Sequence, residues 1–480
     1  MNAGRAMGER AIVIGGSIAG MLAARVLSDH FNEVVVLEKD KLPDRPMKRK
    51  GVPQAKHGHL LLARGARIIQ AMLPDLPDMA TIGAEPRDIA QTRWRHHGVW
   101  KARFDSDLTV YLVNRIEFEH GVRKAVAAIP NIDIRAPFEV AALQLDDAGK
   151  RVIGVLANAR RDGSQESIAA DLVVDASGRG SRSPKWLETM GFGKPRETEV
   201  RVNVGYASCL YQTSPKFQRD KIPIALYPKA PQARRFGLIF QISERGIIVT
   251  LGGWCRDHPP RQYKGFLQFA ESLGHPEFLE LIAAARPSPS IHTHHFPSNM
   301  WRHYERLKRW PEGYVVMGDA FCSFNPAYGQ GMTVCAIQAD AMRRRLAALA
   351  RKRRSITAPG EAHKVQRRMS WGVIVPFLLA TSEDLRYPEV TGLKLPGLRA
   401  LQWYTSHVLE ASAGNVRVVR AFYEVMSLVR SPIILFHPLI VWAVLINALR
   451  RRRQPKAVEV TPEPQPLAPE DPPGERPQPG

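Results

Sequence analysis

GGSIAG, residues Gly15–Gly20, follows the apolar run Ala11–Ile14 and precedes the helical run Met21–Ser28. A second strand-like run, Glu33–Leu37, ends on Glu38. A strand, a glycine-rich turn, a helix and a second strand that ends in an acid form the βαβ unit that binds a dinucleotide. The order of these segments predicts an α/β fold with a Rossmann-like nucleotide site at its start. The alternative is a structural glycine turn in another kind of α/β protein.

Several positions of this unit have a direct chemical purpose in such a site. Gly15 permits the sharp turn, and Gly20 lets the helix pack closely on the strand. The free N–H groups and the positive end of the helix, from Ser17 to Ala19, favour an anionic pyrophosphate. Glu38 follows Gly20 by 18 residues and can accept hydrogen bonds from a ribose 2′-hydroxyl. Ser17 replaces the middle glycine of the usual motif, a small change that the phosphates should tolerate.

The composition is that of a globular protein of two or three domains. The chain has 480 residues, of which 44% are hydrophobic and 24% are charged. Its net charge of +22 would suit nucleic acid or an anionic membrane, but the basic residues are dispersed and no nucleic-acid-binding motif accompanies them. We therefore expect no nucleic acid partner, whereas membrane contact stays open. The four cysteines lack the spacing of a disulfide framework or a metal site, so we expect a cytoplasmic protein without a metal.

Two further motifs combine a strand with a glycine-rich turn. The first, Leu172–Arg182 (LVVDASGRGSR), is common and by itself only structural. The second is Gly313–Ala320 (GYVVMGDA), followed by Asn325–Met332 (NPAYGQGM) and a helical run. An acid at a strand end can hold the hydroxyls of a polyhydroxyl chain, and free N–H groups at a helix start can stabilise negative charge on an electron-rich ring.

Together the three segments resemble the flavin-dependent monooxygenases of the aromatic-hydroxylase superfamily, and most of all its bacterial epoxidase/hydroxylase branch. Gly51–Gly65 (GVPQAKHGHLLLARG) and Ser323–Met332 (SFNPAYGQGM) strengthen the narrower match. The likeness covers roughly residues 10–340 and is weak beyond Glu361. It implies an FAD-binding, glutathione-reductase-type α/β domain with an inserted antiparallel β-sheet for the substrate and a helical C-terminal region. We expect the FAD-binding domain to span residues 1–195, with substrate-facing segments near 82–104, and to resume at 301–355. The antiparallel substrate sheet would span 196–300. A helical region would follow at 356–453, and then a disordered Pro-rich tail at 454–480.

The resemblance also implies roles for single residues of the nucleotide site. The FAD pyrophosphate would be bound at Gly15, Ser17, Ala19 and Gly20, with Glu38 on the adenosine ribose. Asp175 and Gly178 would form a turn near the pyrophosphate and the nicotinamide. Gly318 and Asp319 would hold the ribitol chain. Arg115 matches a family arginine that contacts the flavin region, although a surface arginine at a helix start is an equal alternative.

For the reaction itself, the resemblance points to the segment before the last helix of the FAD-binding part. Pro326 would lie against the isoalloxazine, and the amides around Gly329 and Gly331 would face its N1–C2=O edge. NADPH or NADH would reduce FAD, O₂ would add at C4a, and the hydroperoxide would epoxidise or hydroxylate an apolar substrate. A second G-x-G-x-x-G is missing, so the nicotinamide binds transiently or a separate reductase supplies electrons.

Other residues leave alternatives open. His57 and His59 could flank the flavin or the substrate, but no acidic or cysteine partner suggests a metal. Tyr206 and Tyr211 are expected on opposite faces of one strand, one of them facing the pocket or both in packing. The cluster at His292–His295 is expected near a strand end, in a solvated or structural role.

Ser431–Arg453 is an apolar segment with a tryptophan that ends in four arginines. It suits either peripheral membrane contact through residues 432–453 or a buried helix packed on the flavin domain, and the first would favour a lipophilic substrate. Competing functions on the same fold are a halogenase, a prenyl-chain reductase and a non-catalytic prenyl-binding escort protein. The Trp-x-Trp-x-Ile-Pro signature of halogenases does not occur in the sequence.

Overall fold

The computed structural model describes residues 7–453, and the Pro-rich tail 454–480 lies outside the described residues. At its centre is a five-stranded sheet in the order β18-β12-β1-β2-β8, in which all neighbours are parallel. The strands are β1 (Gly8–Ile14), β2 (Phe31–Leu37), β8 (Ile132–Arg135), β12 (Leu172–Asp175) and β18 (Tyr314–Val316). Their apolar runs are buried on both faces, as expected of a covered parallel sheet. The carboxyl ends of β1, β12 and β18 meet at one edge, which is where such sheets bind ligands.

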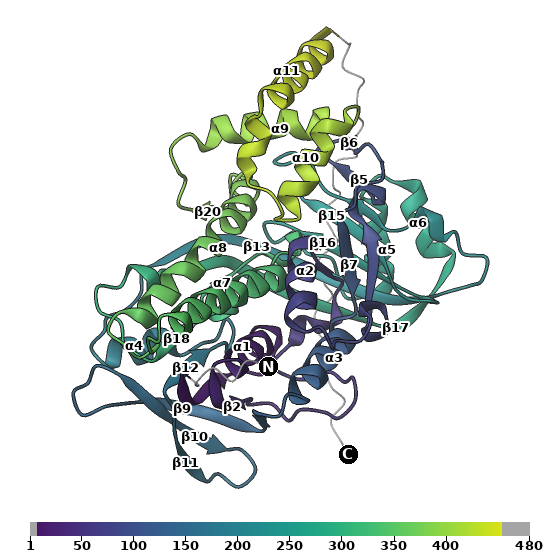
Figure 1. Ribbon diagram of the computed structural model, residues 1–480. Helices are drawn as coiled ribbons and strands as arrows, with labels where there is room; N and C mark the ends of the chain where they lie inside the picture. Colours follow the sequence, from purple (N-terminus) through teal and green to yellow (C-terminus); the bar gives the residue numbers. More distant parts are fainter. Residues whose placement is uncertain (1–6, 454–480) are drawn as a thin grey trace, which may run out of the picture.

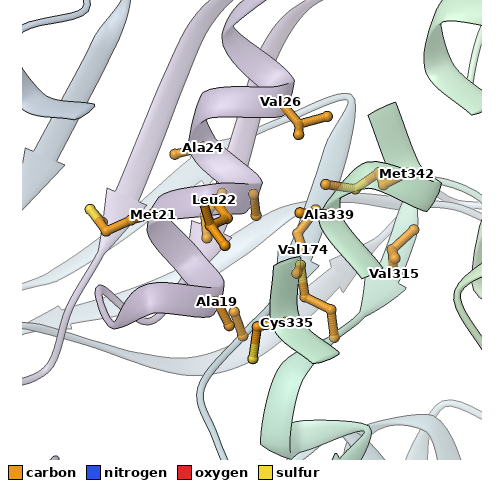
Figure 2. Close-up of a cluster of buried hydrophobic side chains, with 14 of the residues drawn as sticks. Ala19, Met21, Leu22, Ala24, Val26, Val174, Val315, Cys335, Ala339 and Met342 are labelled. Carbon is orange, nitrogen blue, oxygen red and sulfur yellow. The ribbon is translucent and has the colours of Figure 1, made fainter. Parts of the chain in front are cut away.

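Two helices that are far apart in the sequence, α1 (Ile18–Ser28) and α7 (Gly331–Arg351), pack side by side on this sheet. Alanines and a cysteine at the contact let the two helix backbones approach closely. Because α1 follows β1 and α7 follows β18, both helix N-termini lie at the edge where these parallel strands end. Figure 2 shows the contact, in which α1 provides Ala19, Leu22 and Val26, α7 provides Cys335, Ala339 and Met342, and Val174 and Val315 lie in the strands beneath.

The apolar pattern predicts one helix over Leu60–Leu73 and one strand over Ser167–Val174, and both predictions are wrong in detail. The run Leu60–Leu73 is not one helix, because β3 (His59–Leu61) pairs with β7 (Thr109–Val113) before α2 (Ala63–Met72) begins. Ser167–Val174 is two strands, because the chain pairs with Val152–Ala159 up to Ala169 and pairs with β1 from Leu172 onward. The remaining elements of this domain are α3 (Arg115–Ala127), α4 (Ser183–Thr189), β4 (Ala84–Asp88), β9 (Phe138–Leu145), β10 (Val152–Ala159) and β11 (Gln165–Ala169).

The large inserted sheet is mainly antiparallel, as the alternating pattern of residues 200–254 predicts. Its long strands are β13 (Glu197–Thr213), β15 (Arg235–Ser243), β16 (Gly246–Gly253) and β17 (Ala285–Arg302). Short strands extend it: β5 (Arg93–His96), β6 (Val99–Trp100), β14 (Ile224–Leu226), β19 (Cys322–Ser323) and β20 (Thr391–Gly392). Helices α5 (Tyr263–Glu271) and α6 (Pro276–Ala283) cover one face. Tyr211 packs on that face and Tyr206 on the other, as their spacing predicts.

The C-terminal region is helical, as expected. It contains α8 (Glu361–Asp384), α9 (Leu398–Ala411), α10 (Val416–Met426), a 3₁₀ turn η8 (Pro432–Phe436) and α11 (Pro438–Arg453). Figure 1 shows α8 running along α7 and α9–α11 stacked at the end of the molecule opposite β10 and β11. Lys101, which follows β6, connects the inserted sheet to α9. Its buried Nζ donates to Leu409 O (3.1 Å) and to Ser412 Oγ (2.7 Å) at the end of that helix. Within residues 7–453, no helix combines the length and apolarity needed to cross a membrane.

Candidate nucleotide and substrate site

The glycine turn after β1 has the geometry of an anion site. Gly15 has φ +103°, and a Cβ there would lie 2.7 Å from the backbone oxygen of Ala176. A Cβ at Gly20 would lie 1.8 Å from Gly15 O, so α1 can approach the turn only with glycine at this position. Ser17 is the N-cap of α1 but makes no side-chain cap hydrogen bond. Among residues 7–453, the first N–H groups of α1 have no acceptor, which leaves them free for a pyrophosphate.

Glu38 lies at the end of β2 and is buried. Its Oε2 accepts the N–H of Gly16 (2.7 Å) and pairs with Arg49 Nη1 (2.9 Å), while its Oε1 accepts the N–H of Asp40 (2.9 Å). The carboxylate is therefore next to the glycine turn, as the predicted ribose contact requires. It is also already paired with an arginine that the sequence motif does not include.

Arg49 and Arg115 meet on a second buried acid, Glu119. Arg49 Nη2 lies 2.5 Å from Glu119 Oε1, and Arg115 Nη2 lies 2.9 Å from Glu119 Oε2. Burial raises the pKa of Glu119, but the two arginines outweigh this effect and hold its pKa below its usual range. Arg115 also donates to Ser17 Oγ (2.8 Å) and is only 7% exposed, so the surface interpretation of this arginine is wrong. Its contact with the flavin region stays a prediction.

The turn after β12 is held by hydrogen bonds to one of its own residues, Asp175. Asp175 is fully buried and accepts hydrogen bonds from Ser177 N (2.8 Å), Ser181 Oγ (2.5 Å) and the hydroxyl of Ser183. Its carboxylate therefore shapes the turn. Gly178 has φ +86° and open space around its Cα, on a turn that touches Gly15 through Ala176. The structure thus brings this turn beside the glycine turn of β1.

Asp319 follows β18 at the same edge of the sheet. It is half-buried, and among the described residues no donor lies within hydrogen-bonding distance of its carboxylate. Burial raises its pKa, although Arg115 and Arg179 act in the opposite direction. Gly318 before it has φ +65°, and a Cβ there would lie 2.8 Å from the Cβ of Ala19. The free acceptor beside the α1 turn suits a hydroxyl-bearing chain such as ribitol.

The segment between β19 and α7 forms a loop with a free helix start. Pro326–Tyr328 makes a 3₁₀ turn that ends on Gly329 at φ +64°. α7 then begins at Gly331, with Gln330 as an N-cap that makes no side-chain cap bond. Both amide atoms of Gln330 are buried without a partner in the part of the chain that the structure describes. Unpaired donors at a helix N-terminus fit the electron-rich N1–C2=O edge of a flavin, so the residues present fit FAD.

A buried acid that no sequence motif indicated holds this loop in place. Asp384, at the end of α8, is fully buried and accepts four hydrogen bonds. The donors are Trp254 Nε1 (2.8 Å), Asn299 Nδ2 (2.7 Å), Asn325 Nδ2 (3.0 Å) and Tyr328 OH (2.8 Å). Burial raises the pKa of Asp384 to about 6, against the effect of these donors. Two of the donors, Asn325 and Tyr328, lie on either side of Pro326 in the sequence. Asp384 therefore holds in place the turn that is predicted to face the flavin.

A large cavity opens beside this loop and contains about 1370 Å³ of empty space, part of it continuous with solvent. Its floor is the loop from Pro326 to Gln330, one wall is the inserted sheet, and its roof is made by α8, α9, α10 and η8. Most of the lining is apolar or aromatic, including Trp94, Leu112, Leu238, Phe240, Val408, Phe422, Val425 and Leu435. A cavity of this kind suits a large lipophilic molecule.

His57 lies beside the histidines of β17. His57 Nδ1 lies 2.8 Å from Ser208 Oγ, and its ring centroid lies 5.8 Å from that of His294. Burial and His294 lower the pKa of His57 to about 3, so its ring is neutral at neutral pH. His292 to His295 lie inside the long strand β17, not at a strand end. Over residues 7–453, no three His, Cys, Asp or Glu side chains are grouped as metal ligands.

The chain matches known sequences over most of its length. A family model described as "FAD binding domain" matches residues 9–373. "Protein Rv3254" of Mycobacterium tuberculosis is 34% identical over 400 residues, which cover 81% of this chain and 82% of that protein. Squalene monooxygenase of Mus musculus is 27% identical over 342 residues, 67% of this chain but only 52% of that enzyme.

The fold also occurs among solved structures. A flavoprotein/dehydrogenase from Cytophaga hutchinsonii superposes with a TM-score of 0.63 at 14% identity. The superposition covers 92% of this chain and 100% of that one. Because less than a tenth of this chain is left out, the superposition extends beyond residue 373, where the match to the family model ends.

Proposed function

From the premise that the chain belongs to the FAD binding domain family and is a flavin-dependent oxidoreductase, we propose that it is a monooxygenase. It would use NADPH or NADH and O₂ to epoxidise or hydroxylate a large apolar substrate. The observation that carries this proposal is the apolar cavity whose floor is the loop Pro326–Gln330. The same loop is the one expected to lie against the flavin, so a bound substrate would be next to the reactive ring.

FAD, when bound, would supply electron transfer from the nicotinamide and the activation of O₂. The protein's part is to bind, orient and shield. The N–H groups of α1 would neutralise the pyrophosphate, and Asp319 would accept hydrogen bonds from ribitol hydroxyls. The N-terminus of α7 would stabilise negative charge on the reduced ring. The apolar walls would keep water away from the reacting centre.

The relatives support an apolar substrate. Squalene monooxygenase is named for a large hydrocarbon, and this chain matches about half of that enzyme's length. The sequence contains one dinucleotide fingerprint, at Gly15–Gly20. We therefore propose that the nicotinamide binds transiently over the FAD site, with a separate reductase as the alternative source of electrons.

The first test is the visible spectrum of the purified protein and identification of the released chromophore. We expect FAD, followed by NADPH- or NADH-dependent O₂ uptake and incorporation of one atom of ¹⁸O into a lipophilic substrate. Substrate-dependent oxidation of the nicotinamide without O₂ consumption would instead identify a prenyl-chain reductase. A protein that stays colourless after incubation with FAD would contradict the proposal and favour an escort protein.

The assignment of the cavity is tested by filling it. Val425 on α10 is buried and lines the cavity, whereas Val416 on the same helix is exposed and does not. Val425→Phe is expected to lower kcat/KM for a bulky substrate at least about tenfold, equivalent to about 1.4 kcal/mol, by occupying its space. FAD content should not change. Val416→Phe, the matched control, should turn over like the wild type, and equal kcat/KM in both variants would exclude this cavity as the substrate site.

A further inference from the structure

The last helix of the structure has no polar face. Every residue of α11 from Pro438 to Leu449 is apolar except Asn447. Ile440 and Val444 are buried against α9 and α10, so the helix is attached by one side only. A helix that is apolar all round is normally surrounded by protein or lipid. The outward side of α11 therefore lacks a partner within the described chain.

That outward side and the neighbouring η8 carry six exposed apolar side chains, which we call the C-terminal apolar face. Its members are Ile433, Phe436, Leu439, Trp442, Leu445 and Leu449. Ile433 is 75% exposed, Trp442 66% and Leu449 59%, which are large fractions for such side chains. Leu439, Trp442, Leu445 and Leu449 follow helical spacing and share one side of α11. Figure 1 shows α11 at the extreme end of the molecule.

Charge decides what kind of partner fits this face. Residues 431–453 contain no aspartate or glutamate, and the helix ends in four consecutive arginines. A cationic end next to an apolar face with a tryptophan suits the phosphates and acyl chains of an anionic bilayer. A second copy of the chain would bring a like-charged surface to this face, because the net charge of the chain is +22, whereas an anionic bilayer offers the opposite charge.

We propose that the C-terminal apolar face docks on the surface of an anionic lipid bilayer. The helix would lie in the interface, with its apolar side chains toward the acyl chains and its basic end near the lipid phosphates. The face also borders the cavity: Leu435 of η8 lines the cavity, while Ile433 and Phe436 on either side of it are exposed. A lipophilic molecule could then pass from the bilayer to the cavity past η8. This passage rests on the proposed function, whereas the docking of the face on a bilayer does not.

The test is flotation of the full-length protein with vesicles of phosphatidylcholine that contain phosphatidylglycerol as about one third of the lipid, compared with phosphatidylcholine alone. We expect binding to the anionic vesicles that weakens in high salt. Ile433→Glu combined with Trp442→Glu is expected to reduce the bound fraction at least about tenfold, since each carboxylate would enter the acyl region. Ile153→Glu is the matched control, because Ile153 is exposed on β10 at the opposite end of the molecule.

The outcomes distinguish docking on a bilayer from contact between two copies of the chain. Failure of the wild type to float with either vesicle, or equal flotation of the double variant, would overturn the proposal. So would a dimer in sedimentation velocity that the double variant converts to a monomer, because the face would then join two copies. FAD content is measured in the same samples. A colourless protein that still floats would contradict the proposed function while upholding docking.

Discussion

Asp319→Ala is expected to give a folded protein that has lost most of its affinity for FAD. The carboxylate of Asp319 has no donor among the described residues and stands beside the α1 turn. A hydrogen bond to a charged group is worth about 1.5–3 kcal/mol. Loss of one such bond raises the dissociation constant of FAD roughly 10- to 150-fold. Fluorescence titration of the apoprotein with FAD measures this change.

The same residue predicts an opposite effect on the stability of the apoprotein. Burial raises the pKa of Asp319 above its unfolded value, so the ionised form opposes folding. The stability that the protonated carboxyl of Asp319 contributes to the folded protein is present at low pH and is lost as pH rises through the folded pKa. Apo Asp319→Asn should therefore melt no lower than wild type at about pH 7 while binding FAD less tightly. Asp133→Ala, at an exposed acid of the same sheet, is the control for both measurements. An unchanged dissociation constant for FAD in Asp319→Ala would contradict the assignment.

Asp384→Ala is expected to be the most destabilising single change near the site. It would leave four buried donors without an acceptor, each at a cost of about 1–3 kcal/mol. Because part of this cost is relieved by relaxation, we expect a loss of roughly 3–5 kcal/mol in the free energy of unfolding. Release of Asn325 and Tyr328 should also let the Pro326 turn move. Urea unfolding, with turnover measured on the folded fraction, gives both effects.

Asp384→Asn separates the charge from the shape of this residue. The folded pKa of about 6 exceeds the unfolded value of 3.8, so wild-type stability should fall as pH rises from about 4 to about 6. The shift corresponds to about 3 kcal/mol. In Asp384→Asn this pH-dependent part should disappear, which a comparison of the two unfolding curves at about pH 4 and about pH 6.5 detects. Identical pH dependence in both proteins would refute the role of this carboxyl.

What the sequence could predict was local. The βαβ unit and Asp319 lie in short motifs, in each of which a strand is followed directly by a glycine-rich turn. The structure brings these motifs to one edge of the sheet. Helix and strand periods are ambiguous in short apolar runs such as Leu60–Leu62, and there the prediction failed. The strand β3 exists because β7, about fifty residues later, pairs with it.

The residues that were missed act through distant partners. Arg49 meets an acid 70 residues away, and Asp384 accepts from a tryptophan 130 residues away. Neither arginine nor aspartate has a local signature at these positions, so only the folded chain identifies them. The same holds for the cavity, whose floor, wall and roof come from three parts of the sequence.

The position of the cavity roof has a consequence for how such proteins diversify. The family match ends at residue 373, while the roof on α9, α10 and η8 comes from residues beyond 400. The floor and the sheet wall of the cavity are thus encoded within the stretch that the family model matches, and most of its roof is encoded after that stretch. On the proposed function, mutations in that later stretch would change which molecules fit under the roof, while the residues expected to bind FAD would stay the same.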